Sequence, residues 1–429
     1  MTNRDYSAVI IIHMESLNEE IFWGDIANYP NLRMLLKESV YCDRFYTTAT
    51  STIMGMTDFV YGDRTACENS ADLEHFRLSS ENTSLFEELA KRQYVTKVLN
   101  YPELSGTDYG NMKQIFGERT QVVQHRDYKE FLGMLSELIC ADEPVALYVY
   151  DWSSLLTQPQ MERPDSFVQS CKNRYRRLDD TVGFVMEQLK KAGKYQEALI
   201  VLFGDHGDDL YCEEFHNGFT HAIEPYYSLI KTPLILKNFD LAQEDAHRLT
   251  ALTDVRGLIL SCLDGKICKE KREYVVARNL FLCQKSKMLN KSVCVTDGEY
   301  MLLASRKGME LYCTLYSNYS HFNLLHLYRL LPEGKLRYRS WMSRVETEHF
   351  MYLMDAYHKD FADVFLRLYG LLKEELFRME RAAGGKETYL HWIKKIRPDS
   401  RMHRQMRMLW LKKTCWRIKD NIFEKKQKN

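Results

Sequence analysis

The stretch EALIVLFGDHGDD, residues 197–209, constrains the fold more than any other part of the chain. An unbroken aliphatic run bounded by polar residues is typical of a strand buried on both faces of a parallel sheet covered by helices. This run stops at Gly204 and is followed at once by Asp205 and His206. In open α/β sheets, ligands bind beyond the carboxyl ends of the strands. A carboxylate beside an imidazole at that place suits a divalent metal such as zinc or manganese.

A second apolar run, AVIIIHM at residues 8–14, ends in the same way on Glu15. Because parallel strands present their carboxyl ends at one edge of the sheet, we expect Glu15 to meet the Asp205 and His206 pair. Glu15 and the GDHGDD stretch each also have a purely structural explanation. Glu15 would then be an acid favoured by the dipole of a helix over residues 18–26, and GDHGDD would be a strand ending in a polar turn.

Composition sets the class of protein. With 429 residues, 45% of them hydrophobic and 28% charged, the chain can bury a large core and is expected to form one large domain with appendages. The formal net charge of zero gives no bias toward nucleic acid, so no nucleic-acid partner is expected. The eleven cysteines have no CxxC spacing, and no signal peptide or membrane-spanning run is evident. These features predict reduced thiols and a cytoplasmic protein.

A hydroxyl-rich segment precedes an apolar helical pattern near residue 52. It contains Thr47, Thr48, Thr50, Ser51 and Thr52, and Met54, Met56, Phe59 and Val60 follow at roughly helical spacing. A hydroxyl at a helix start is usually an N-cap. Beside a divalent cation, it is also a candidate nucleophile, because the cation and the helix N-terminus lower its pKa and attract an anionic substrate.

These features together resemble the sulfatase branch of the alkaline phosphatase superfamily. The pattern consists of Glu15 after a first strand, PNL at 30–32, a hydroxyl-rich helix start ending in Gly62-Asp63-Arg64, and GDHGDD at 204–209. Weaker stretches keep the family's order at residues 174–207, 221–236, 252–265 and 292–312, so the resemblance covers about residues 6–330. It implies an α/β fold: a mostly parallel sheet covered by helices on both faces, a small C-terminal sheet and a helical tail.

The departures from the family pattern indicate the branch. Thr52 stands at the position that sulfatases convert to formylglycine, which cannot form from threonine. A single Glu15, with Thr50-Ser51-Thr52, is similar to phosphoethanolamine transferases and lipoteichoic acid synthases. That resemblance implies Thr52 as nucleophile and a metal shell of Glu15, Thr52, Asp205 and His206 around one or two Zn²⁺ or Mn²⁺ ions.

Three further residues are candidates for contact with the substrate. His221 keeps the family's spacing to Pro233, and the resemblance implies that it faces the substrate phosphate or protonates the leaving group. His216 is a competing candidate whose alternative is a surface loop histidine. Asp151 follows a strand where the family often places a histidine, and it is therefore a candidate substrate-binding residue.

The C-terminal third lies beyond the resemblance. We predict a catalytic core over 1–265, a small subdomain over 266–335, a helical extension over 336–398 and a basic tail over 399–429. Apolar residues at i, i+3 and i+4 spacing predict a helix over 341–382 that packs on the core or on a second copy in a homo-oligomer. Residues 401–429 hold ten Lys and Arg, two acids and two tryptophans. This composition is typical either of a solvated tail or of a peripheral contact with the inner face of a membrane.

The sequence thus predicts a metal-dependent hydrolase or transferase acting on phosphate esters or diesters through Thr52, with a glycan- or lipid-linked substrate. One alternative is a sulfate-ester hydrolase that works without formylglycine. The other is a non-catalytic scaffold in a membrane-bound glycan-assembly complex.

Overall fold

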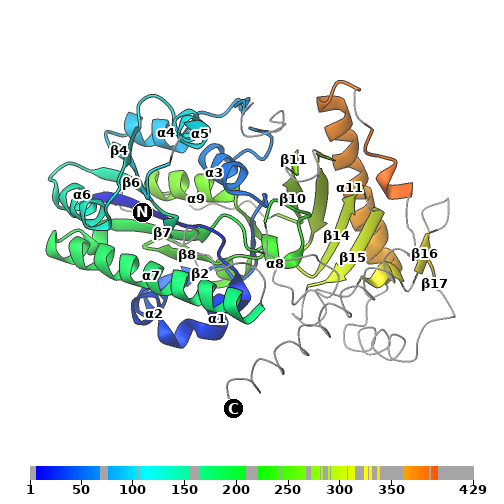
Figure 1. The fold of residues 1–429 in the computed structure, drawn as a ribbon, viewed down its shortest axis with the longest axis horizontal. Helices are drawn as coiled ribbons and strands as arrows, with labels where there is room; N and C mark the ends of the chain where they lie inside the picture. The colour runs from blue at the N-terminus through cyan, green and yellow to red at the C-terminus, as the bar shows by residue number, and fades with distance from the viewer. Residues whose placement is uncertain are drawn as a thin grey trace, which may run out of the picture.

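A seven-stranded sheet forms the centre of the larger part of the molecule (Figure 1). Its strands in spatial order are β2 (Ser39–Tyr41), β8 (Leu234–Lys237), β7 (Ala198–Gly204), β1 (Ala8–Met14), β6 (Val145–Asp151), β4 (Val95–Tyr101) and β5 (Gln121–Gln124). The strands β7, β1, β6, β4 and β5 run parallel, whereas β8 pairs antiparallel with β7 and with β2. The predicted mostly parallel sheet is confirmed.

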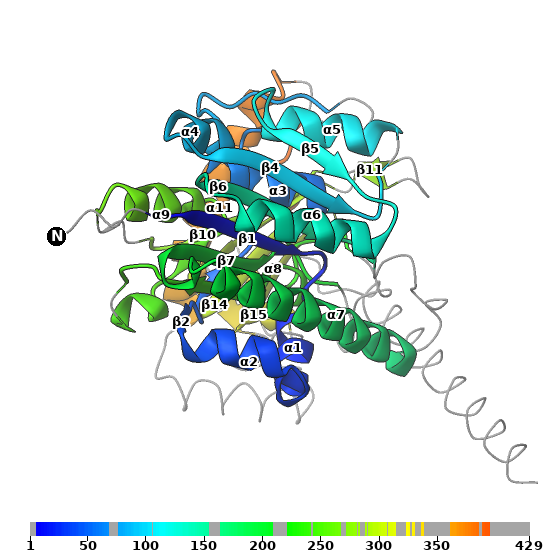
Figure 2. The same cartoon turned by 90° about the vertical axis from the view of Figure 1, so that its left-hand side faces the viewer.

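Helices cover both faces of this sheet, as predicted (Figure 2). One face packs on α1 (Glu19–Asp25), α2 (Pro30–Lys37), α6 (Tyr128–Cys140) and α7 (Pro164–Lys191). The other packs on α3 (Thr52–Tyr61), α4 (Leu85–Lys91), α5 (Gly106–Phe116) and α9 (Asp254–Leu263). The alternation of β1 explains the two cores, because Ile10 and Ile12 face the first helix layer while Val9 and Ile11 face the second. Every residue of β1 is buried.

Local signals account for the helices that follow β1. Asn18 caps α1, because its side chain accepts a hydrogen bond from the amide of Ile21. Pro30 occupies the first position of α2, where its missing N–H costs no hydrogen bond. The expected helix over 18–26 is therefore present, and Glu15 lies upstream of its cap instead of in its first turn.

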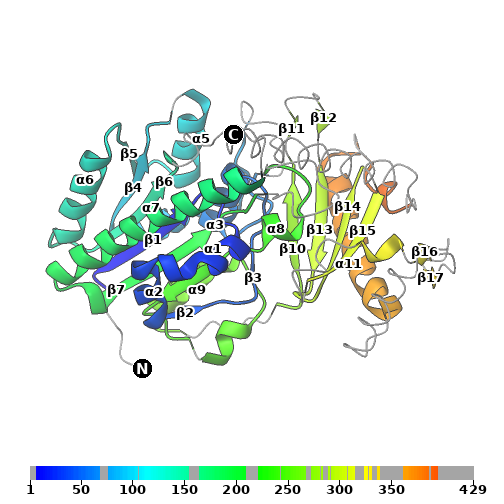
Figure 3. The ribbon, with the colours of Figure 1, turned by 60° about the horizontal axis from the view of Figure 1, so that its bottom comes forward.

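A four-stranded antiparallel sheet lies beside the larger part (Figures 1 and 3). Its strands in order are β10 (Val275–Asn279), β13 (Ser292–Thr296), β14 (Tyr300–Ser305) and β15 (Gly308–Cys313). The long helix α11 (Phe361–Ala382) packs on β13 and β14. The predicted small C-terminal sheet is confirmed, and the described part of the predicted long helix covers one of its faces.

Short elements complete the architecture. Three two-stranded ladders are formed by β3 (Phe45–Tyr46) with β9 (Thr250–Ala251), β11 (Leu282–Cys283) with β12 (Met288–Leu289), and β16 (Tyr328–Leu330) with β17 (Leu336–Tyr338). The helix α8 (Tyr227–Ile230) and short 3₁₀ turns at Ile26–Asn28, Tyr195–Glu197, Gln243–His247, Leu324–His326 and Trp392–Lys394 connect the larger elements.

The computed structural model describes residues 6–67, 76–104, 106–153, 164–208, 221–241, 243–266, 272–280, 282–283, 288–289, 291–306, 308–314, 323–326, 328–330, 336–338, 361–385 and 388–394. His216, the beginning of the predicted 341–382 helix and the basic tail lie outside these ranges. Within them, no helix is both long and apolar enough to cross a bilayer. Seven cysteines among these residues are free thiols: Cys42, Cys67, Cys140, Cys171, Cys262, Cys294 and Cys313.

Candidate active site

Glu15 lies at the carboxyl end of β1, in the middle of the main sheet. Its side chain is 2% exposed, and Tyr150 on the neighbouring strand β6 donates a hydrogen bond to Oε2 at 2.5 Å. The chain turns sharply after Glu15, because Ser16 has a φ of 54°. This left-handed backbone aims the Ser16 amide at Asp205 Oδ1, 3.2 Å away. The ends of β1 and β7 are thereby joined directly beside Glu15.

Asp205 and His206 follow β7 directly and are fully buried. Asp205 Oδ1 accepts hydrogen bonds from the amides of Ser16 and His206. His206 Nδ1 lies 2.9 Å from the carbonyl oxygen of Gly207. Since a carbonyl oxygen only accepts, Nδ1 carries the proton, and Nε2 presents its lone pair to the site.

Gly207 is required by close packing. A Cβ atom at this position would lie 2.0 Å from the carbonyl oxygen of Ser228 in α8. The Gly207 amide donates a hydrogen bond to the carbonyl of Leu229 at 2.8 Å. The glycine after His206 therefore lets α8 approach the end of β7 and fixes the backbone that carries the imidazole.

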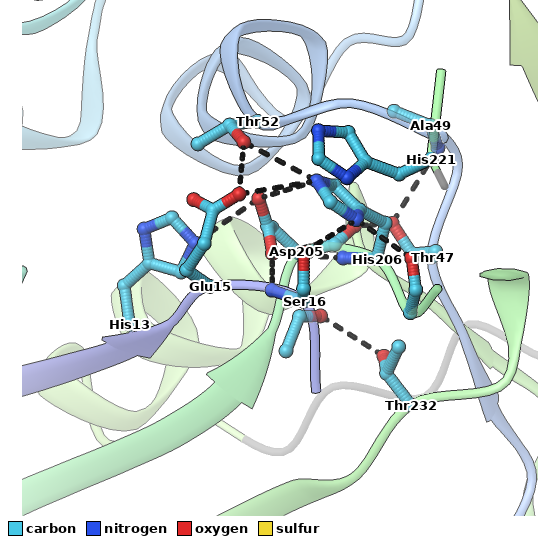
Figure 4. Close-up of polar contacts among 12 residues, drawn as sticks. His13, Glu15, Ser16, Thr47, Ala49, Thr52, Asp205, His206, His221 and Thr232 are labelled. Carbon is cyan, nitrogen blue, oxygen red and sulfur yellow. Dashed lines mark hydrogen bonds and ion pairs between the residues drawn. The ribbon is translucent and has the colours of Figure 1, made fainter. Parts of the chain in front are cut away.

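Thr52 is the first residue of α3, and the start of this helix lies against the end of β7. A Cβ at Gly55 would come within 3.0 Å of the Asp205 Cβ. The Thr52 hydroxyl donates to Glu15 Oε1 at 2.7 Å and lies 3.2 Å from His206 Nε2 (Figure 4). The structure thus brings together all four residues that the resemblance implies as a metal shell.

The four side chains have the spacing of a ligand set. His206 Nε2 lies 3.6 Å from Glu15 Oε1 and 3.4 Å from Asp205 Oδ2, with the Thr52 hydroxyl in the same space. Asp205 Oδ2 is buried, and the Nε2 atoms of His13 and His206 lie 3.2 and 3.4 Å from it. A buried carboxylate oxygen beside an imidazole lone pair fits a divalent cation, because both groups can be ligands. Burial opposes ionisation of Asp205, but His206 and His13 lower its pKa and keep it anionic.

His13 belongs to this site, and sequence reasoning missed it. Its Nε2 lies 3.2 Å from Asp205 Oδ2, and its Nδ1 lies 2.8 Å from the Tyr148 hydroxyl. The ring is stacked between Tyr150 and Phe203, with centroid distances of 4.6 and 5.1 Å. Among the described residues, His13 converges with Glu15 and Asp205 in one group of candidate ligand atoms, and Glu15 and His206 converge with His221 in another. The signal in the sequence was a polar residue inside an aliphatic strand two positions before Glu15.

His221 lies beside His206. The two rings are stacked with centroids 4.6 Å apart (Figure 4). His221 Nδ1 lies 3.1 Å from Asp208 Oδ1. Arg174 of α7, which is 1% exposed, pairs with the other Asp208 oxygen at 3.2 Å. Burial opposes ionisation of Asp208, but the bond to His221 and the charge of Arg174 lower its pKa to about 2. Burial disfavours the charged imidazole, yet Asp208 raises the His221 pKa above its ordinary value.

Asp151 lies at the carboxyl end of β6, on the same edge of the sheet. Its carboxylate accepts hydrogen bonds from Arg177 at 2.8 Å and from the Ser153 amide at 3.0 Å. Arg177 in turn stacks over the ring of Tyr128 at 3.9 Å. These contacts give Asp151 a structural role in holding α7 to the sheet, and its predicted contact with substrate stays a prediction. His216 lies outside the described residues.

Comparison with known proteins finds one family similar to the part of the chain that carries three of these residues. The sulfatase family model matches residues 156–265, the part that carries Asp205, His206 and His221. No curated protein matches the chain significantly in sequence.

Solved structures resemble the whole fold. A 2-O GAG sulfatase matches with a TM-score of 0.60 and 12% identity, covering 89% of this chain and 94% of its own. A phosphonate monoester hydrolase from Silicibacter pomeroyi matches with a TM-score of 0.53 and 15% identity, covering 78% and 99%. An alkaline phosphatase superfamily protein from Vibrio parahaemolyticus matches with a TM-score of 0.51 and 14% identity, covering 81% and 85%.

Residues 156–265 are thus similar to the sulfatase family, and the fold of the chain is similar to that of solved structures from the alkaline phosphatase superfamily. The predicted fold class and the resemblance to the sulfatase branch are confirmed. The side chains of Glu15, Thr52, Asp205 and His206 form the candidate active site of this fold.

Proposed function

We propose that the protein is a metal-dependent phosphoric ester hydrolase or transferase that uses Thr52 as its nucleophile. The observation that carries the proposal is the position of the Thr52 hydroxyl, 2.7 Å from Glu15 Oε1 and 3.2 Å from His206 Nε2 at the first residue of a helix. A threonine hydroxyl needs a base or a cation to become nucleophilic, and this position supplies a carboxylate and a candidate metal site.

Glu15, Thr52, Asp205 and His206 would hold the ion, and their mixed carboxylate, hydroxyl and imidazole donors suit Zn²⁺ or Mn²⁺ better than Ca²⁺. When bound, the ion would lower the pKa of the attacking hydroxyl and polarise the ester. His13, Glu15 and Asp205 offer donors for a second ion within the same cluster.

The residues of the chain divide the reaction between them. The Thr52 oxygen attacks phosphorus and passes its proton to Glu15, so that an oxygen–phosphorus bond forms while the bond to the leaving group breaks. His221, held as an acid by Asp208, protonates the departing oxygen. The free amides at the start of α3 bind the non-bridging oxygens of the anionic group. A water or an acceptor hydroxyl, deprotonated by the now neutral His221, then attacks phosphorus. The bond from phosphorus to the Thr52 oxygen breaks, and Glu15 returns its proton to that oxygen.

The first test is turnover of a nitrophenyl phosphodiester by the metal-loaded protein, with nitrophenyl sulfate as the comparison. The sulfatase-family match favours sulfate as the second candidate. The threonine in place of a formylglycine precursor favours phosphate. Preference for the sulfate ester would support the sulfatase alternative, and no turnover of either ester by protein with bound metal would support the scaffold alternative.

The proposed role of His221 as the acid can be tested by the dependence of kcat on the leaving group. His221→Gln should slow esters with poor leaving groups about 100-fold, because an alkoxide needs the proton, and should slow nitrophenyl esters only a few-fold. Steady-state kcat over a series of leaving groups measures this slope. Equal losses for good and poor leaving groups would show that His221 binds the substrate and does not act as the acid.

The wider setting of the enzyme also belongs to the proposal. We propose a glycan- or lipid-linked substrate, a cytoplasmic location, contact with the inner membrane face and a homo-oligomer, and the support for these is the sequence pattern alone. The basic tail that would make the membrane contact lies outside the described residues.

A further inference from the structure

Arg278 connects the small sheet to the active-site segment. It lies on β10, the edge strand of the small sheet that faces the larger part of the molecule (Figures 1 and 3), and it is fully buried. Its amide donates to the carbonyl of Thr48 at 3.0 Å, and Ala49 forms a parallel bridge with Arg278. The segment 47–51, which leads into Thr52, is therefore paired with a strand from more than 200 residues further along the chain.

The side chain of Arg278 reaches the helix that Thr52 begins. Its Nη2 lies 3.6 Å from Asp58 Oδ1, and both side chains are completely buried. Asp58 Oδ2 accepts a hydrogen bond from the Thr48 hydroxyl at 2.6 Å. Burial raises the pKa of Asp58 to about 7, and the Arg278 charge and the Thr48 hydroxyl limit this rise. We call Thr48, Asp58 and Arg278 the buried brace.

The opposite side of the segment is held as well. The Thr47 hydroxyl donates to the carbonyl of Asp205, and the Thr50 hydroxyl donates to the carbonyl of Ile223 at 3.1 Å. The amide of Ala222 donates to the Thr50 carbonyl. The segment 47–51 is thus fixed between β10, the end of β7 and the residues that follow His221.

We propose that Arg278 and Asp58 are positioning residues of the active site, which act through Thr48 to keep the Thr52 hydroxyl between Glu15 and His206. A buried ion pair contributes little net stability compared with apolar residues of the same volume, so stability alone is a weak reason for its presence. A nucleophile, in contrast, loses much of its rate when displaced by about 1 Å. The catalytic part of this inference rests on the function proposed above, whereas the fixing of the segment does not.

The decisive comparison is Thr48→Val against Thr48→Ser in the full-length, metal-loaded protein. Valine keeps the shape of threonine and removes the hydroxyl that bonds Asp58, whereas serine keeps the hydroxyl. We expect Thr48→Val to lower kcat for a nitrophenyl phosphodiester at least tenfold with KM within about twofold. Thr48→Ser should restore most of kcat. Asp58→Asn, which removes the charge that faces Arg278, should resemble Thr48→Val.

Amide hydrogen exchange provides a readout that needs neither turnover nor metal. Peptides covering residues 47–56 should exchange faster in Thr48→Val and Asp58→Asn than in Thr48→Ser. Glu375→Gln is the matched control, because Glu375 of α11 is 5% exposed and pairs with Arg64, just beyond α3, and with Arg378. Its ion pairs within the described part of the chain thus involve no residue of the segment 47–51. It should leave kcat and the exchange of these peptides unchanged.

The outcomes separate the two proposals. If the wild type turns over no ester but the exchange differences appear, the proposed function fails and the brace stands as the element that fixes the segment. If Thr48→Val and Thr48→Ser are alike in both exchange and kcat, the brace does not position Thr52 and the inference is overturned. The same conclusion follows if Glu375→Gln accelerates exchange as much as Asp58→Asn.

Discussion

The two walls of the active site are built by different means. One wall is the edge of the main sheet, where Glu15, Asp205 and His206 follow adjacent parallel strands and are almost completely buried. The other is made of connecting segments, which carry Thr52 and His221 and depend on contacts from β10 and α8 for their shape. The sheet wall follows from strand pairing, whereas the segment wall exists only because distant elements pack around it.

This difference separates two kinds of role. Residues on the sheet wall are placed by a rigid backbone, which suits ligands that must keep a fixed geometry around an ion. Residues on the segment wall are the proposed nucleophile and the proposed acid, and their positions depend on hydrogen bonds that single substitutions can remove. Substitutions on the sheet wall should therefore affect metal binding, whereas substitutions on the segment wall should affect kcat.

The largest effect is expected at Thr52. Thr52→Ala should lower kcat by about 10³-fold or more at an unchanged melting temperature, because the nucleophile is lost while three candidate ligands remain. Mass spectrometry after rapid quenching should find the phosphoryl adduct on Thr52 in the wild type. Thr50→Ala is the comparison, because it removes one of the hydrogen bonds that hold the segment 47–51 and leaves the nucleophile in place. It should cost about 1 kcal/mol of stability and lower kcat far less than Thr52→Ala does. An active Thr52→Ala protein, or an adduct on Ser51, would contradict the assignment.

Substitutions on the sheet wall should reduce metal binding. His206→Ala should reduce bound zinc or manganese from near stoichiometric to a small fraction, because the imidazole supplies one of four donors. Elemental analysis of the purified protein measures this loss. His247→Ala is a matched control, because the His247 side chain is 63% exposed and pairs with Asp43 on the surface. Equal metal content in the two variants would place the ion elsewhere.

The brace predicts a pH dependence of stability. The pKa of Asp58 is about 7 in the folded protein against an ordinary value of 3.8, so the folded state binds more protons between these pH values. Wild-type stability should therefore fall relative to Asp58→Asn as pH rises from about 4 to 7, by at most about 4 kcal/mol. Urea unfolding at several pH values measures the difference.

Glu375 gives a control of opposite sign. Although burial opposes ionisation, the arginines around Glu375 lower its pKa to about 2. The wild type should gain stability relative to Glu375→Gln as pH rises from about 2 to 4.5, and no further change should occur above that range. A flat profile for Asp58→Asn against the wild type between pH 4 and 7 would show that Asp58 ionises normally in the folded state.

The smallest effect concerns the basic tail and leaves both walls untouched. Near an anionic membrane, each Lys or Arg contributes about 1 kcal/mol, and tryptophans prefer the interface. The full-length protein should float with liposomes that contain anionic lipid, and a chain ending at Pro398 should not. The difference should fade at high salt. Equal flotation of both proteins would identify the tail as a solvated end.

The sequence by itself determined the sheet wall. Two aliphatic runs that end in polar residues predicted two parallel strands, and the common edge of such strands predicted that Glu15 would meet Asp205 and His206. Thr52 was located because its position resembles the modified residue of sulfatases. These predictions succeeded for two reasons. The strands and the helix start are marked by local sequence patterns. The carboxyl ends of parallel strands lie at one edge of the sheet, whatever the order of the strands in it.

Only the tertiary structure decided which groups support these residues. Two neighbouring strands contribute His13, Tyr148 and Tyr150. The sequence of neither strand shows that the two strands pair. Arg278 looked like an ordinary residue of a small sheet until the fold placed it against Asp58. Contacts of this kind depend on strand register and on the packing of whole elements, which are fixed by the burial of many side chains together and not by any short pattern.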